Sequence, residues 1–360
     1  MKDAILKSYF SSDVRAKTWK KLSALLRNNV SELQALELFK KRAEEKKDPV
    51  ATFFFGGNPL AVIFTRVIDE INKGSPLDVA LYTWVPHEEV MLIRAGKKSA
   101  NLPESLMDCV GLIEAKKKIM ASVMKAIGGP LVMASLFIVL LLVVALYFVP
   151  AISQLSDPAY WGGGARILYV ASSFVSSLAG VLALILFAGL VFGVFFSMPF
   201  WTGPLRVRFD DFPPWSIYRL MVGSFWLFTV ATLMRANTSL DIIFKDMRNS
   251  GVLSPWLLER VQRISELYRE DANFGKLLLH LKMNFPDKEM VEELAVYATM
   301  PNFHKNMYDE AKQWLNDSLE RIDAQAQIIN FALFICVVAA LCGVGVAIGS
   351  IQGQLNFGAL

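Results

Sequence analysis

The chain has 360 residues, of which 54% are hydrophobic and 19% are charged, and its formal net charge is +4. So small a basic excess is weak support for nucleic-acid binding, and basic residues beside anionic lipid headgroups explain it better, so we expect no nucleic-acid partner. The three cysteines, Cys109, Cys336 and Cys342, have neither metal-ligand spacing nor the pattern of a disulfide framework.

The N-terminal polar region, residues 1–126, is predicted to form a bundle of six helices. Trp19 and Leu22 share one face of an opening helix, and Ser31 with Gln34 has the capping-box spacing that begins a second helix. Asn58-Pro59 begins a third, amphipathic helix by the cap-then-proline rule. The other signals for helix ends and starts are Gly74, Pro76, Pro86 and Asn101.

Three stretches, 131–152, 167–201 and 328–351, contain no Asp, Glu, Lys, Arg or His. Each reaches the ~20 residues that a helix needs to cross a bilayer core. A soluble core does not need helices of this length without a single charge. We therefore predict an all-α polytopic membrane protein with three transmembrane helices.

The predicted boundaries follow from these stretches. The first bundle, 1–126, is followed by transmembrane helix 1 over 127–152, a short loop over 153–165 and transmembrane helix 2 over 166–201. A second bundle over 202–326, transmembrane helix 3 over 327–351 and a tail over 352–360 complete the chain.

Basic residues predict which side of the membrane each part occupies. Those beside the spans, which are Lys116, Lys117, Lys118, Lys125, Arg206 and Arg208, lie on the side of the two bundles. The positive-inside rule therefore places the N-terminus and both bundles in the cytoplasm, and the loop and the tail in the periplasm. Arg166 departs from this pattern. The chain starts without an apolar signal-peptide segment, so we expect the first span to direct insertion.

The second bundle repeats the plan of the first. Residues 25–31 (Leu-Leu-Arg-Asn-Asn-Val-Ser) match 233–239 (Leu-Met-Arg-Ala-Asn-Thr-Ser), and Val85-Pro86 matches Phe285-Pro286. Six helices are expected in the same order, so we predict a duplication. Residues 217–234 are apolar enough for a fourth span, but their alignment with the helix around Trp19 favours a buried helix.

Residues for chemistry are sparse. The histidines, His87, His280 and His304, lack a second ligand at metal spacing, and we expect no catalytic, cofactor or metal site. The spans carry small residues instead, and we expect these to pack helices within the chain or against an oligomer partner: Gly189, Gly193, Gly345, Gly349 and Gly353. Gly128-Gly129-Pro130, at the entry to the first span, is either a hinge or a helix start.

The tandem bundles and the order of spans resemble the F-protein family of type II secretion and type IV pilus systems, the GspF/PilC inner-membrane platform proteins. In that family, a helix of each domain closes on a Gly-Glu-x-x-Gly-x-Leu pattern, and residues 96–102 (Gly-Lys-Lys-Ser-Ala-Asn-Leu) stand at that position here. Lys97 stands where the family has glutamate, and Ala100 or Asn101 takes the place of the second glycine, which argues against a cation-binding role for this turn. The divergence is closer to the type IVb pilus members.

The resemblance implies a non-enzymatic platform that links a cytoplasmic assembly ATPase to pilin or pseudopilin subunits. It also implies contacts with other inner-membrane assembly proteins and with the lipid bilayer, and a homo-oligomer. The candidate partner-binding residues are basic or polar and lie near the turn or the membrane: Lys97, Lys98, Asn101, Lys116, Lys117 and Lys118. For the last three, lipid headgroup contact is the alternative role.

Two other functions are weighed against this one. A small membrane transporter or channel subunit would need polar residues along the spans, where the sequence offers mainly serines. An intramembrane enzyme would need reactive groups, and Cys336 and Cys342 are better explained as small apolar packing residues.

Overall fold

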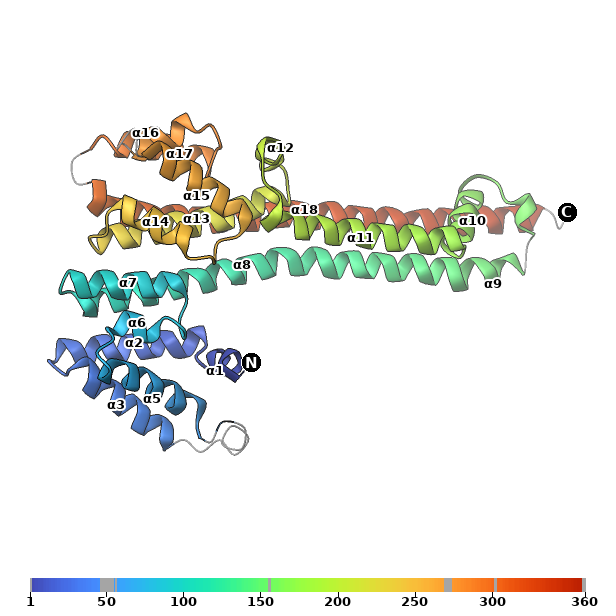
Figure 1. Cartoon of the computed structure of the whole chain (residues 1–360). Coiled ribbons are helices and arrows are strands. Elements are labelled where there is room, and N and C mark those ends of the chain that lie inside the picture. Colours follow the sequence, from blue (N-terminus) through green and yellow to red (C-terminus); the bar gives the residue numbers. More distant parts are fainter. Residues whose placement is uncertain are drawn as a thin grey trace. The chain divides into compact units, whose positions relative to one another are not determined.

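The computed structural model describes residues 2–45, 55, 57–154, 157–268, 274–300 and 303–357. These residues form helices and connecting turns, with no strand among them (Figure 1). The predicted all-α class is therefore confirmed. The chain divides into two compact units. Unit 1 comprises Met1–Ile119 and Pro199–Ser318, and unit 2 comprises Met120–Met198 and Leu319–Leu360.

The first bundle lies in unit 1. Its helices are α1 (Lys2–Tyr9), α2 (Ser12–Arg27), α3 (Glu32–Glu44), α5 (Pro59–Asn72), α6 (Leu77–Leu81), α7 (His87–Lys98) and the start of α8 (Leu102–Val143). The predicted local signals are confirmed. Ser31 and Gln34 form both bonds of the capping box, and Asn58 accepts a bond from the Leu60 N–H at 3.0 Å. The apolar stripe of α5 packs inward, with Ile63 and Val67 fully buried.

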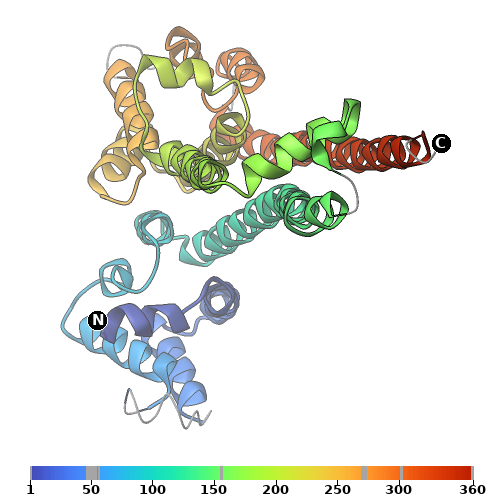
Figure 2. The ribbon, with the colours of Figure 1, turned by 90° about the vertical axis from the view of Figure 1, so that its right-hand side faces the viewer.

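The second bundle also lies in unit 1. Its helices are α12 (Pro204–Phe209), α13 (Trp215–Arg235), α14 (Leu240–Asn249), α15 (Pro255–Tyr268), α16 (Phe274–His280), α17 (Lys288–Tyr297) and the start of α18 (Phe303–Phe357). Two views show the bundles as separate groups of helices, with α7 and α8 of the first facing α13 and α14 of the second (Figures 1 and 2).

The matched sequence segments form the same backbone turn in both bundles. Asn29 after α2 and Asn237 after α13 each have φ of 60°, in the left-handed region. In each turn the following residue donates its N–H to a carbonyl five residues earlier, at 3.1 Å. This is the Schellman arrangement, which satisfies carbonyls at a helix end, and asparagine tolerates the left-handed backbone better than most residues. The turns are alike in detail, while the duplication of the whole bundles remains a prediction.

Helix α13 contains the ambiguous segment 217–234. Among the residues that the structure describes, four helical stretches are long and apolar enough to cross a membrane: Leu102–Ser153, Leu178–Phe200, Trp215–Arg235 and Asn306–Val346. Within the most apolar window of α13, 72% of the residues are buried inside the protein, whereas in Leu178–Phe200 the share is 6%. This contrast is what a buried bundle helix requires. The number of spans actually used remains a prediction.

Unit 2 contains the apolar part of α8, a π-helical turn (Val144–Phe148), α9 (Val149–Ser153), a 3₁₀ turn (Pro158–Tyr160), α10 (Gly163–Val175), most of α11 (Leu178–Phe200) and the C-terminal part of α18. The helix-start interpretation of 128–130 is wrong, because α8 continues through Pro130. The side-chain amide of Asn330, on α18, lies 2.6 Å from the point where a Cβ of Gly129 would be, so this glycine is needed for close helix approach.

The single helix predicted over 166–201 is also wrong, because α10 ends at Val175 and α11 begins at Leu178. Ser177 begins the new helix by accepting the Gly180 N–H at 3.2 Å. A Cβ on Gly180 would collide with the backbone of Phe174 and Val175, so only glycine fits this sharp turn. The local signals for the helix break are thus a serine N-cap and a glycine within an uncharged stretch.

A proline near the far end of α8 explains its π-helical turn. Pro150 cannot donate the backbone hydrogen bond that the preceding turn requires, and the helix widens just before it. The Ser172 hydroxyl of α10 donates to the Ala145 carbonyl at 2.8 Å, which is the interhelix bond expected of the serines in this segment. Trp161 and Ala165 pack against Val144 and Val149 at the two ends of this turn. Leu146 and Tyr147 on its other face stay exposed.

Candidate functional site

The turn that ends α7 carries the first group of predicted residues. Ala100 has φ of 53°, and the Asn101 N–H donates to the Gly96 carbonyl at 2.9 Å, so the turn is again a Schellman cap. A Cβ on Gly96 would lie 2.5 Å from the Ser105 hydroxyl oxygen, so α7 and α8 approach closely there. A physical reason for glycine therefore exists at both positions. At position 96 glycine allows α7 and α8 to pack closely, and at position 100 the backbone is left-handed.

The residues of this turn have different surroundings. The Lys97 ammonium pairs with the Glu32 carboxylate at 3.1 Å, so its charge is already met within the first bundle. The turn thus places a lysine–glutamate pair at the position of the family glutamate. Lys98 is exposed and lines a pocket described below, and Asn101 is exposed at the start of α8. The turn therefore brings Lys98, but not Lys97, to a cavity.

The three consecutive lysines of α8 point to different neighbours. The Lys116 ammonium lies 5.6 Å from the ring centre of Phe225, in the second bundle. Lys117 pairs with Asp13 of α2. Lys118 is exposed, and no described carboxylate pairs with it. The triplet is therefore not a single basic patch, because two of its members are occupied within unit 1.

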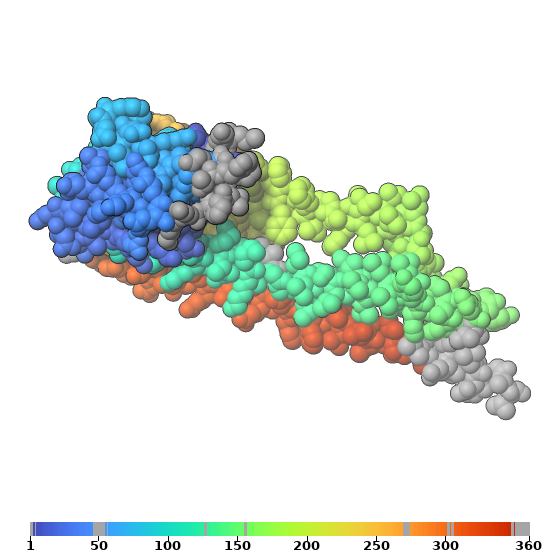
Figure 3. Space-filling view, turned by 90° about the horizontal axis from the view of Figure 1, so that it is seen from below, coloured from blue at the N-terminus to red at the C-terminus, as the bar shows by residue number. Residues whose placement is uncertain are grey.

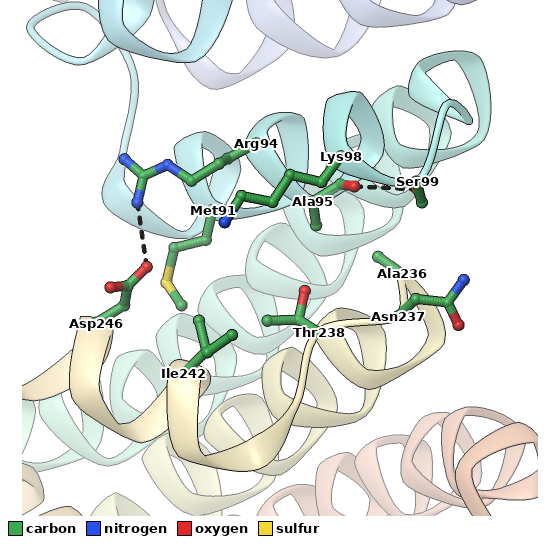
Figure 4. A pocket seen from close by; sticks show the side chains of 10 residues that line it. All are labelled: Met91, Arg94, Ala95, Lys98, Ser99, Ala236, Asn237, Thr238, Ile242 and Asp246. Atoms are coloured by element: carbon green, nitrogen blue, oxygen red, sulfur yellow. Dashed lines mark hydrogen bonds and ion pairs between the residues drawn. The ribbon is translucent and has the colours of Figure 1, made fainter.

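A pocket of about 300 Å³ lies between the bundles in unit 1. One wall is α7, and the other is the turn after α13 together with α14 (Figure 4). Ten residues line it: Met91, Arg94, Ala95, Lys98, Ser99, Ala236, Asn237, Thr238, Ile242 and Asp246. The pocket is built by the two turns that the sequence singled out, at 96–102 and 233–239, and we take it as the candidate site.

Arg94 connects the two walls of the pocket. Its guanidinium donates to the Asp78 carboxylate of α6 at 2.9 Å and to the Asp246 carboxylate of α14 at 3.2 Å. Asp78 is buried and Arg94 is 35% exposed, so this bridge is partly shielded from water. Its charge is fully committed to two carboxylates. Sequence reasoning missed Arg94 and Asp246, because they are 152 residues apart and share no local motif.

A second ion pair joins the bundles next to the pocket. Arg235, the last residue of α13, pairs with Asp108 of α8, and its guanidinium carbon lies 3.4 Å from the ring centre of Tyr308 on α18. Residues 236–238, which form a wall of the pocket, follow directly in the chain. We name the group Asp108, Arg235 and Tyr308 the arginine clasp.

A buried carboxylate orders the core of the first bundle. Glu89 of α7 accepts hydrogen bonds from the Trp19 indole N–H at 2.7 Å and from the Arg15 guanidinium at 3.0 Å. Burial raises the pKa of Glu89, and Arg15 and Trp19 oppose this effect. The Cys109 thiol is fully buried beside it, and burial raises its pKa well above the ordinary value, so it is unreactive in the fold.

A charged cluster is buried in the second bundle. Arg206, Asp210 and Arg260 have no exposed surface, and the Arg260 guanidinium donates to the Asp210 carboxylate at 2.6 Å. The Arg260 guanidinium also stacks on Trp256, 3.8 Å from the ring centre. Burial lowers the pKa of Arg260 to about 10, although Asp210 favours the charged form. One carboxylate therefore serves two buried cations.

The glycine rows expected to pack helices lie in open space within the chain. No atom lies within 4 Å of the point where a Cβ would be on Gly189, Gly193, Gly345 or Gly349. The surroundings of Gly353 are outside the described part of the structure. Helix α11 is exposed along nearly its whole length, and an apolar groove of about 340 Å³ lies between it, α10 and α8. Figure 3 shows that α8 and α11 separate along part of their length. Packing by these glycines therefore needs another molecule, and it remains a prediction.

Among the described residues, no group of three or more histidine, cysteine, aspartate or glutamate side chains is placed to hold a metal ion. The charged groups that do gather, in the pocket and the buried clusters, are paired with one another.

Comparisons with known proteins agree with the sequence resemblance. Residues 20–150 match the family model described as "Type II secretion system (T2SS), protein F". The chain is 24% identical over 246 residues to the toxin coregulated pilus biosynthesis protein E of Vibrio cholerae serotype O1. That alignment covers 65% of this chain and 68% of the Vibrio protein. The predicted resemblance to the GspF/PilC proteins is therefore confirmed.

Proposed function

We propose that this chain, whose residues 20–150 match the type II secretion system protein F family, is the inner-membrane platform of a type IV pilus or type II secretion assembly machine. The family match carries the proposal, because it covers most of the first bundle and the helix that continues from it into an apolar segment. Similarity to a pilus biosynthesis protein favours the pilus over the secretion system.

In this role the chain couples a cytoplasmic assembly ATPase to the insertion of pilin subunits into a fibre. Two features support the division of labour. Unit 1 is a rigid scaffold of paired charges that offers docking surfaces. Helix α11 is apolar and exposed, so its faces must contact lipid, a second copy or the apolar helices of pilins and other assembly proteins. The chain itself performs no chemistry in this proposal, and the partner supplies the energy.

Deleting the chain from cells that assemble the fibre tests the function. We expect surface fibres, or the secreted substrate, to disappear and to return when the intact chain is supplied again. Normal fibres in the deletion strain would refute the platform role.

The proposed topology has the N-terminus and both bundles in the cytoplasm, and the segments around 153–165 and 352–360 in the periplasm. Reporter fusions after Asp157 and after Glu320 test it. We expect a periplasmic signal from the first and a cytoplasmic signal from the second. In intact cells, a reagent that cannot cross the membrane should fail to label residues near Glu266, and labelling there would contradict the topology.

A further inference from the structure

We infer that the pocket between the bundles is a docking site for a single carboxylate side chain, flanked by apolar side chains, of a protein partner. The inference rests on the proposed function, which makes the assembly ATPase that partner. Lys98 is the anchor of the site, and Met91 and Ile242 are its apolar contacts (Figure 4).

The charge of the pocket defines the ligand. Arg94 is committed to Asp78 and Asp246, so its positive charge is already met. Lys98 is the lining cation that no described carboxylate neutralises. One free ammonium can neutralise a ligand with one negative charge, whereas a doubly charged phosphate would keep one charge without a partner. The charge balance therefore selects a carboxylate over a phosphorylated ligand.

The shape and lining of the pocket favour a protein side chain over a free metabolite. Ile242 is 44% exposed at the pocket. Contact of this apolar surface with water is unfavourable, so covering it with an apolar side chain is favourable. The volume of about 300 Å³ is at the lower limit for small-molecule sites. The pocket is not enclosed, so an inserted side chain continues into contacts outside it. An acidic residue beside a leucine-like residue, presented by a partner surface, meets both requirements.

The uncommitted donors of the pocket add specificity for a carboxylate. Thr238 points its hydroxyl from the turn after α13 toward the α7 wall that carries Lys98, whereas the amide of Asn237 lies at the rim and points away from it (Figure 4). A carboxylate has two oxygens and about four acceptor positions, so it can accept from an ammonium on one side and from a hydroxyl on the other. A partner side chain bound in this way contacts both bundles at once.

Charge reversal at the anchor tests the inference. The full chain is purified in detergent from cells that express the assembly ATPase, and the ATPase retained per chain is measured. We expect Lys98→Glu to lower retention about tenfold or more, since it replaces an attraction with a repulsion across a desolvated contact. Lys98→Arg should retain the ATPase. Lys21→Glu is the matched control, because Lys21 is an exposed lysine of α2 outside the pocket, and it should stay within about twofold of the native chain.

The outcomes separate the two proposals. If the native chain retains the ATPase and Lys98→Glu retains it equally well, the docking site is refuted while the platform role stands. If the native chain retains no ATPase, the proposed coupling fails and the docking site fails with it. Equal losses in Lys98→Glu and Lys21→Glu would show a diffuse basic surface and would also refute the pocket. Ile242→Asp provides an independent variant, and undiminished retention there would refute the apolar contact.

Discussion

Replacing Ala100 by glycine should stabilise the protein. Ala100 ends α7 with φ of 53°, a conformation in which the Cβ of an L-residue crowds the following carbonyl. The residue is exposed, so removing its methyl group uncovers little apolar surface. The hydrogen bonds of the turn are made by the backbone and are retained in Ala100→Gly. The substitution therefore relieves strain without removing a packing contact.

The expected gain is the difference between two terms. The left-handed backbone costs a residue with a Cβ about 1–2 kcal/mol. Glycine gives the unfolded chain more freedom, which costs about 0.5–1 kcal/mol on folding. The midpoints of the two ranges give a net stabilisation of about 0.75 kcal/mol, and the extremes allow up to about 1.5 kcal/mol. For a domain of this size, such a gain raises the unfolding temperature by roughly 1–4 °C.

Thermal unfolding in detergent, followed by tryptophan fluorescence, measures this shift. The matched control is Ala24→Gly, in an exposed position inside α2 with ordinary helical backbone. The same chemical change there should destabilise by about 1 kcal/mol. Opposite signs for the two substitutions are the expected result. A loss of stability in both would show that the backbone of Ala100 is not left-handed in the folded protein.

Three further variants test the packing and the buried charges. Gly96→Ala should destabilise by about 1–3 kcal/mol, because its Cβ would lie 2.5 Å from the Ser105 hydroxyl; an unchanged midpoint in chemical unfolding would contradict the close helix approach. Asp210→Asn should cost about 3–5 kcal/mol, because it removes the buried carboxylate that Arg206 and Arg260 share. Glu114→Gln in an exposed ion pair should cost no more than about 1 kcal/mol, and equal effects would argue against burial of the cluster. The raised pKa of Glu89 means that the folded state binds the proton of this carboxyl more tightly than the unfolded state does. The stabilisation that protonated Glu89 contributes is therefore fully present below the ordinary pKa and is lost as the pH rises through the raised pKa. The stability difference between the native chain and Glu89→Gln should therefore favour the native chain more at pH 5 than at pH 7, and a pH-independent difference would refute the shift.

Local signals in the sequence predicted local structure well. Ser31, Asn58 and Gly74 act through atoms within a few residues, so their caps and stops form as the sequence indicates. The break between α10 and α11 also has local signals, in Ser177 and Gly180. Continuous hydropathy does not reveal this break. Hydropathy indicates whether a segment faces lipid or water, but it does not indicate whether the helix is continuous.

The candidate site could be predicted only in part. The turns at 96–102 and 233–239 stood out in the sequence, and both wall the pocket. The bonds that hold the walls together join residues 152 and 127 positions apart, in the pairs Arg94–Asp246 and Arg235–Asp108. No periodicity or spacing rule encodes such pairs, since each depends on how two separately folded bundles meet. The same limit explains why Lys97, chosen for its place in a motif, turned out to pair with Glu32.

The arginine clasp links the wall of the pocket to helices α8 and α18. Arg235 holds Asp108 of α8 through an ion pair and Tyr308 of α18 through ring stacking, and both helices continue into apolar segments. The next residues in the chain, 236–238, wall the pocket. A partner side chain that displaces this turn therefore acts one residue away from the group that fixes both helices. The planar guanidinium of Arg235 stacks on the Tyr308 ring and pairs with Asp108 at the same time, and a compact, strongly hydrated lysine ammonium would stack less well, so Arg235→Lys should weaken this link.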